Sequence, residues 1–178
     1  MARRILYFDR PRRFIVGTVG LPGERTFFLQ AASGHELATV LVEKAQAALL
    51  ADRLEELLGE VGETAPAAGQ DDNDPLELPL EEEFRAGALA LGWEPTRERI
   101  VVEAHALTEE SEPAELGDDD PDAPDTLRVA IDAGQAYAFI RRARALVAAG
   151  RPPCPFCLQP LDATGHVCPR ANGYRRRP

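Results

Sequence analysis

The stretch Val40-Leu-Val-Glu-Lys-Ala-Gln46 decides the fold, because the pattern returns as Val129-Ala-Ile-Asp-Ala-Gly-Gln135. In each copy a short apolar run, typical of a buried strand, is followed by an acidic residue and, three positions later, by a glutamine. That spacing favours a capping box at the start of a helix, with Glu43 or Asp132 as the N-cap. The sequence therefore predicts that each half of the chain passes from a strand directly into a helix.

The residues after each stretch carry the apolar stripe of an amphipathic helix. Both copies place apolar side chains at i, i+4, i+7 and i+8, which puts them on one face of a helix. The helices are expected at 44–59 and 133–149, and the matching stripe positions are Leu50, Leu54, Leu57 and Leu58, then Phe139, Ala143, Leu146 and Val147.

Towards the N-terminus of each helix the repeat extends through two more strands. Phe14-Ile-Val-Gly17 matches Phe84-Arg-Ala-Gly87, and Phe27-Phe-Leu-Gln-Ala31 matches Ile100-Val-Val-Glu-Ala104. Residues 5–8 predict a further strand, and residues 76–80 predict a weak edge counterpart. The predicted fold class is α+β, with duplicated strand-strand-strand-helix units forming an antiparallel sheet that carries both helices on one face. The repeated strands are expected at 13–20, 25–32 and 37–43, then at 84–93, 98–108 and 126–132.

Acidic and basic residues are unevenly distributed along the chain, which the net charge of −10 does not show. Residues 60–83 and 109–125 each hold nine acidic residues and no lysine or arginine, which leaves the rest of the chain at +8. Few large apolar groups lie in these spans, so we expect solvated loops there. The predicted organisation is a duplicated domain over 1–150, with halves 1–60 and 75–150, followed by a separate segment over 151–178.

That last segment carries the sharpest chemistry in the chain, Cys154-Pro-Phe-Cys157 followed by His166-Val-Cys168. Zinc takes four tetrahedral ligands and prefers thiolate and imidazole in structural sites. Cys154, Cys157, His166 and Cys168 form a complete set, so the sequence predicts a small zinc knuckle that binds one structural ion. Two alternatives stay open, a redox dithiol at Cys154 and Cys157, and cysteines that bind nothing.

Arginines gather near both ends of the chain, and they suggest an anion-binding function. Arg10, Arg12 and Arg13 lie close to Asp9 and form a candidate clamp, which suggests an enzyme that acts on an anionic, phosphorylated small molecule. The basic ends, with Arg175-Arg-Arg177, together with the zinc knuckle suggest weak and salt-sensitive nucleic-acid binding instead. Solubility and salt bridging explain the same residues equally well.

No grouping of nucleophile, base and orienting residue is visible in the sequence. His35 and His105 read as isolated turn and strand histidines, without an acidic partner at an informative spacing. No apolar run is long enough for a transmembrane helix, and residues 5–8 are too short for the core of a signal peptide. The leading hypothesis is a non-enzymatic cytoplasmic binding or adaptor protein with an unknown protein partner.

Two motifs give the chain a family resemblance over its whole length. They are Phe8-Asp-Arg-Pro-Arg-Arg-Phe14 and the C-terminal series Cys-Pro-Phe-Cys, Gly-His-Val-Cys-Pro-Arg and Asn-Gly-Tyr over 154–174. The chain resembles an uncharacterised actinobacterial family, a domain of unknown function, which implies no catalytic residues. Genes of that family neighbour those of histidine-phosphatase-like and phosphoinositide-kinase-like proteins, which implies a shared pathway or complex.

Overall fold

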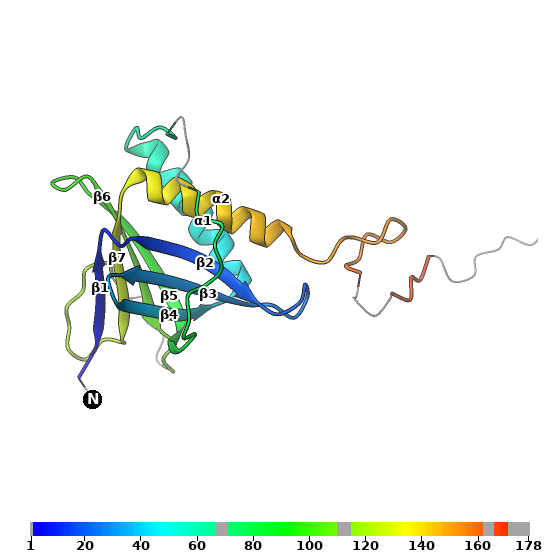
Figure 1. The fold of residues 1–178 in the computed structure, drawn as a ribbon, viewed down its shortest axis with the longest axis horizontal. Coiled ribbons are helices and arrows are strands. Elements are labelled where there is room, and N and C mark those ends of the chain that lie inside the picture. The colour runs from blue at the N-terminus through cyan, green and yellow to red at the C-terminus, as the bar shows by residue number, and fades with distance from the viewer. Residues whose placement is uncertain (1, 67–70, 110–114, 162–165, 171–178) are drawn as a thin grey trace, which may run out of the picture.

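A computed structural model describes residues 2–66, 71–109, 115–161 and 166–170 of the chain. Strands and helices follow the predicted order, and their ends lie close to the predicted ones (Figure 1). The elements are β1 (Ile5–Asp9), β2 (Arg13–Val19), β3 (Thr26–Ser33), β4 (Glu36–Val42), α1 (Lys44–Glu60), β5 (Glu82–Glu94), β6 (Arg99–Ala106), β7 (Thr126–Ile131) and α2 (Ala133–Ala148).

The predicted fold class is confirmed, since the strands form one mostly antiparallel sheet in the order β1-β7-β6-β5-β4-β3-β2. Within each half the three strands form an antiparallel meander. Two pairs are parallel, β4 with β5 and β1 with β7, which the sequence did not reveal. A parallel neighbour needs a long crossover, and α1 supplies it between β4 and β5. The predicted edge strand at 76–80 does not form.

Both helices pack on one face of the sheet and share a single apolar core (Figure 1). Leu54, Leu58 and Phe139 are fully buried, and the rings of Phe139 and Phe14 stack with their centroids 5.0 Å apart. The capping boxes form as predicted: Asp132 accepts a hydrogen bond from the backbone N–H of Gln135 at 2.8 Å, and the Gln46 side chain accepts one from the Glu43 N–H. Among the described residues no helix is long and apolar enough to cross a membrane.

The opposite face of the sheet contains buried polar groups beside a few buried apolar side chains that lie outside the main core. Side chains alternate between the faces of a strand, and every second residue of β3, β6 and β7 belongs to the helix-covered core. The buried polar residues occupy the alternate positions in those strands and in β4. They are Gln30, Thr39, Glu103, His105 and Thr126.

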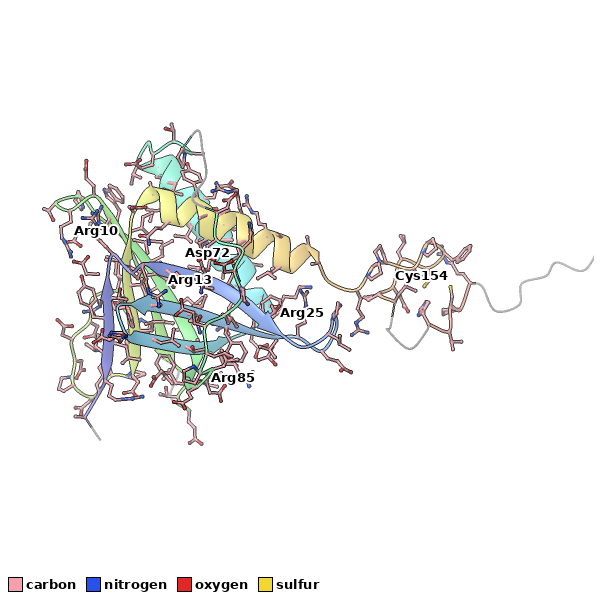
Figure 2. The ribbon with its side chains drawn as sticks, viewed as in Figure 1. Arg10, Arg13, Arg25, Asp72, Arg85 and Cys154 are labelled. Carbon is pink, nitrogen blue, oxygen red and sulfur yellow. The ribbon has the colours of Figure 1, made fainter. Side chains whose placement is uncertain are left out.

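The described residues of the acidic spans form mostly exposed loops, but a few of their side chains pack against this face of the sheet. Asp72 forms a two-point ion pair with Arg13, at 2.6 and 2.8 Å, beside β2 (Figure 2). Leu76 lies where a side chain on Gly17 would be, and Leu116 lies in the same way over Gly92. The spans are poor in large apolar residues, yet one leucine from each reaches a gap left by a glycine.

Candidate metal centre

A short hairpin after α2 places the first two cysteines. Cys154 donates its backbone N–H to Gln159 O at 2.8 Å, and Leu158 donates its own to Cys154 O at 2.9 Å. An isolated bridge pairs Pro153 with Pro160, so the chain doubles back over Cys154-Pro-Phe-Cys157. Leu158 adopts a left-handed backbone conformation with φ of 62°, which closes this turn. The local hydrogen bonds thus direct both thiols to one side.

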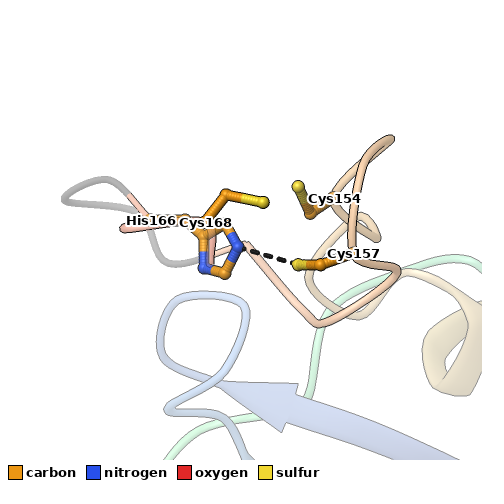
Figure 3. A group of neighbouring side chains, drawn as sticks. All are labelled: Cys154, Cys157, His166 and Cys168. Atoms are coloured by element: carbon orange, nitrogen blue, oxygen red, sulfur yellow. Dashed lines mark hydrogen bonds between the residues drawn. The ribbon is translucent and has the colours of Figure 1, made fainter. Parts of the chain in front are cut away.

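The structure brings all four predicted ligands together (Figure 3). The Sγ atoms of Cys154, Cys157 and Cys168 and a ring nitrogen of His166 lie within 4.8 Å of one another. Cys157 Sγ and His166 Nε2 are 3.1 Å apart. Cys154 and Cys168 are buried, and all three cysteines are free of disulfide bonds. This group could hold a metal ion.

Backbone dipoles make one of the thiols unusually acidic. The backbone N–H groups of Cys157 and Phe156 point at the Cys154 sulfur and lower the pKa of that thiol to about 7. The backbone N–H of Gln159 lowers the pKa of Cys157, but burial and the neighbouring thiols of Cys168 and Cys154 outweigh it, so the pKa is raised. Without a cation, the negative charge of one thiolate raises the pKa of the neighbouring thiols and opposes their ionisation. A bound cation would remove that conflict.

Four protein ligands leave no open position on a tetrahedral ion, which is the arrangement of a structural site. The segment has little apolar core of its own, since Phe156, Leu158 and Val167 are 62%, 75% and 79% exposed. A module this small needs another source of ordering energy, and metal coordination is the usual one.

Two arginines of the predicted anion clamp, Arg12 and Arg13, form ion pairs with acidic residues. Arg12 donates two hydrogen bonds of 2.6 Å to Glu77, and those bonds lower the pKa of Glu77 to about 2. Arg13 is paired with Asp72. Arg10 lies between β1 and β2 in a left-handed backbone conformation, with φ of 52°. Two of the three guanidinium groups therefore already have carboxylate partners. Residues 175–177 lie outside the described residues.

One polar cluster was missed, and the prediction that His105 is isolated is wrong. Nε2 of His105 lies 3.2 Å from Glu103 Oε2, and Nδ1 lies 3.0 Å from Thr126 Oγ1. Arg128 and the backbone N–H of Gly117 both donate to the other oxygen of Glu103. Burial raises the pKa of Glu103, but the close contact with His105 and the hydrogen bond from Arg128 outweigh it and leave the pKa lowered. The sequence could have revealed this cluster, because Glu103 and His105 are two residues apart in one strand and such residues lie on the same face.

The side chains of this cluster are too deeply buried for a catalytic site. Glu103 and His105 are 0% and 1% exposed, and the loop around Gly117 covers them. Glu103 Oε2 and His105 Nε2 face each other without a well-aligned hydrogen bond to any described residue. The cluster therefore joins β6, β7 and the second acidic span within the fold.

Comparison with known proteins places the chain in a family without assigning it an activity. No curated protein and no solved structure matches it. The model of one family, described as a protein of unknown function (DUF3090), matches residues 6–168, from β1 to the last of the four ligands. The chain therefore belongs to the DUF3090 family.

Proposed function

We propose that this protein is a non-enzymatic cytoplasmic binding or adaptor protein whose C-terminal segment is held by one structural zinc ion. The observation that carries the proposal is the convergence of Cys154, Cys157, His166 and Cys168 within 4.8 Å. Because the four residues complete a tetrahedral shell, the ion would order the segment and leave no position for a substrate. Unpaired thiols that act as metal ligands also fit a reducing compartment.

Zinc is the ion that this donor set favours. Thiolate ligands select zinc, copper(I) or iron–sulfur clusters, and an imidazole beside three thiolates in a tetrahedral group is most typical of structural zinc. Magnesium and calcium would require oxygen ligands, and the converging group contains none.

The surroundings of Cys154 support the metal over the redox alternative. A reactive dithiol of the Cys-x-x-Cys type lies at the start of a helix, which stabilises its thiolate. Here the motif lies in the turn of a short hairpin, and no helix follows Cys157 among the residues described up to Arg170.

The proposal of a non-enzymatic role rests on how the polar groups are used. Asp132 and Gln135 form a helix cap, and His105 is buried beneath a loop. The most perturbed carboxyl, Glu77, is an ion-pair partner of two arginines. Each of these groups has a structural task, so none is left to act as an acid, a base or a nucleophile.

Metal analysis of the full chain, purified without chelator, tests the proposal. We expect one zinc per chain, and we expect His166→Ala to lose it while His35→Ala, which alters an exposed turn histidine, retains it. Chelation should expose the amides of Cys154, Leu158 and Leu161 to hydrogen exchange, because their hydrogen bonds hold the hairpin, and should leave the sheet protected. Metal-free protein with those amides still protected would contradict the proposal.

A further inference from the structure

Strand β5 is longer than the strand beside it, so part of one of its edges has no neighbouring strand. β4 pairs with β5 only as far as Arg85, whereas β5 continues to Glu94 along β6. The side chain of Gln46 in α1 donates to the carbonyls of Ala86 and Gly87. Between Gly87 and Glu94, no backbone group of the described residues bonds to this edge. An open strand edge is a template for pairing with another extended chain.

The open edge borders an apolar groove of about 380 Å³ between β5 and α1, called here the β5 groove. Three consecutive residues, Leu89-Ala90-Leu91, line it. Successive side chains of a strand point to opposite faces, so a cavity that contacts three in a row lies at the edge of the strand. Leu49 and Leu57 line the wall formed by α1, and Leu49 is 55% exposed. The groove therefore places a strand edge beside apolar side chains.

A second groove lies in the matching place of the first half, between β2 and α2. It is lined in part by Phe14, and its volume is only about 110 Å³. The partner of Phe14 in β3 is the alanine that ends the pattern 27–31. The partner of Leu89 in β6 is the alanine that ends the corresponding pattern 100–104. The two grooves therefore adjoin corresponding strand positions.

The first acidic span occupies the groove beside β2. Asp72 lines that groove, and the guanidinium of Arg142 donates to the Val16 carbonyl of β2 at 2.5 Å and to the Asp72 carbonyl at 2.6 Å. Arg13 adds a hydrogen bond to the Asp74 carbonyl at 3.2 Å. An arginine on the helix thus holds the backbone of a crossing segment against the outermost strand of the sheet.

Arg53 of α1 has the position that Arg142 has in α2, but its hydrogen bond is different. Each arginine directly precedes a residue of the apolar stripe, Leu54 or Ala143. The guanidinium of Arg53 pairs with Glu56 on its own helix, and the side chain is 63% exposed. An exposed ion pair of this kind contributes little to stability. Arg53 can therefore turn towards an incoming backbone carbonyl at little cost.

The charges on the rim of the β5 groove indicate what else an occupant carries. Glu56 and Glu60 line the groove from α1, at the positions where α2 has Ala145 and Ala149. When Arg53 turns to a peptide carbonyl, Glu56 loses its partner, and a basic side chain on the peptide would pair with the two carboxylates. An acidic segment like the one beside β2 would be repelled by them.

We propose that the β5 groove binds an extended peptide segment of a partner protein, apolar with a basic residue, which adds to the edge of β5 as a strand. Main-chain hydrogen bonds would supply affinity, and pockets for alternate side chains would supply specificity. Leu49, Leu57 and Leu91 would receive the apolar side chains, and Arg53 would donate to the peptide backbone. This inference rests on the proposed binding or adaptor function and names the kind of partner that it takes.

An array of synthetic peptides tests the groove. In each peptide Leu, Ile, Val or Phe alternates with Thr, a Lys or a Glu ends the sequence, and the length is that of residues 86–94. Binding to the full, zinc-loaded chain is measured by fluorescence anisotropy. We expect the best Lys-ended peptides to bind about tenfold more tightly than their Glu-ended counterparts, because like charges repel at the rim. Glu60→Lys should reduce or reverse that preference.

Two substitutions with a matched control locate the binding site. Leu49→Asp should abolish binding, whereas Leu21→Asp, which alters a 66% exposed leucine in the turn between β2 and β3, should leave it unchanged. Arg53→Gln should weaken binding about tenfold through the loss of a charge-assisted hydrogen bond. Hydrogen exchange should show that the peptide slows the exchange of β5 amides between Gly87 and Glu94, as addition of a strand requires.

Four outcomes would overturn the proposal. They are the absence of binding by every peptide of the array, binding that survives Leu49→Asp, a preference for Glu-ended peptides, and β5 amides whose exchange the peptide does not change. A dimer that Leu49→Asp dissociates would assign the groove to a second copy instead. Binding that appears only after residues 110–114 are replaced by Gly and Ser would assign it to the chain's own acidic span. Zinc is measured in the same samples, so zinc without peptide binding refutes the groove alone, and peptide binding without zinc refutes the structural metal alone.

Discussion

Two buried polar residues on the face of the sheet away from the helices have different partners in the two halves of the sheet. Gln30 in β3 and Glu103 in β6 hold matching places in the sequence patterns of 27–31 and 100–104, and both are buried. The Gln30 amide accepts from the backbone N–H of Glu77 at 2.7 Å and donates to its carbonyl at 3.0 Å and to Thr39 at 3.1 Å. Glu103 instead lies among Arg128, His105 and the N–H of Gly117.

The difference follows from what each side chain can offer. A carboxamide is both donor and acceptor, so it can pair with both backbone groups of one loop residue and remain neutral. A carboxylate is an acceptor only, and once buried it needs cationic or N–H donors around it. In the first half, neutral hydrogen bonds from Gln30 therefore hold the acidic span against the sheet. In the second half, the charged Glu103 carboxylate holds it.

The largest expected effect comes from truncating the two central residues. Glu103→Ala would leave Arg128 and His105 without their shared partner and should cost about 3 kcal/mol, because breaking a buried ion pair is strongly destabilising. Arg128 keeps Asp119 as a partner, which places the cost at the lower end of that range. Gln30→Ala leaves only neutral groups unpaired and should cost about 2 kcal/mol. Denaturant unfolding of both variants gives the comparison.

Equal costs for the two truncations would remove the distinction between the halves. A matched control is available in Thr18→Ala, a half-exposed position on β2, where a surface substitution should change stability by no more than about 0.5 kcal/mol.

Much of this fold could be predicted because it depends on short-range pattern. The capping boxes at Glu43 and Asp132 and the stripe through Leu54 depend on spacings of three and four residues, and the ligand set depends on spacings within 15 residues of Cys154. The parallel pairing of β4 with β5 depends on which strands become neighbours across a crossover, which periodicity does not record. The packing of the second acidic span over Glu103 was missed for a similar reason. Leu116 lies in a polar stretch of sequence, and only the folded structure shows that Gly92 leaves room for its side chain.

A smaller effect should separate the two glycines that lie under the acidic spans. At Gly17 an added Cβ would lie 2.4 Å from Leu76 Cγ, near the base of that side chain, so Gly17→Ala must displace the loop. At Gly92 only the tip of Leu116 is within 3 Å, and Leu116 is 41% exposed, so its side chain can turn away. We expect Gly17→Ala to cost about 1–2 kcal/mol by overpacking. Gly92→Ala should be close to neutral, because alanine regains about 0.5–1 kcal/mol of backbone entropy in a strand.

Thermal unfolding of the two alanine variants measures this difference. A larger loss at Gly92 than at Gly17 would show that the second span is the more tightly packed of the two, which would reverse the expected order.

The smallest expected effect is a dependence on pH that belongs to the second half alone. The groups that face Glu103 are Arg128 from β7 and His105 from β6, and the pKa of Glu103 is lowered below its ordinary value of 4.5. A carboxyl whose pKa is lower in the folded state stabilises the fold fully above its unfolded pKa and loses that contribution as the pH falls through the folded one. The stability advantage of the wild type over Glu103→Gln should therefore be constant from about pH 7 down to about pH 5 and should shrink below about pH 4.5. Gln30→Ala has no titrating group at the equivalent position, so its cost should change little over the same range. Urea unfolding at several pH values measures both differences, and a cost for Glu103→Gln that stays constant down to pH 3 would show that the ionised carboxylate contributes nothing beyond what an amide provides.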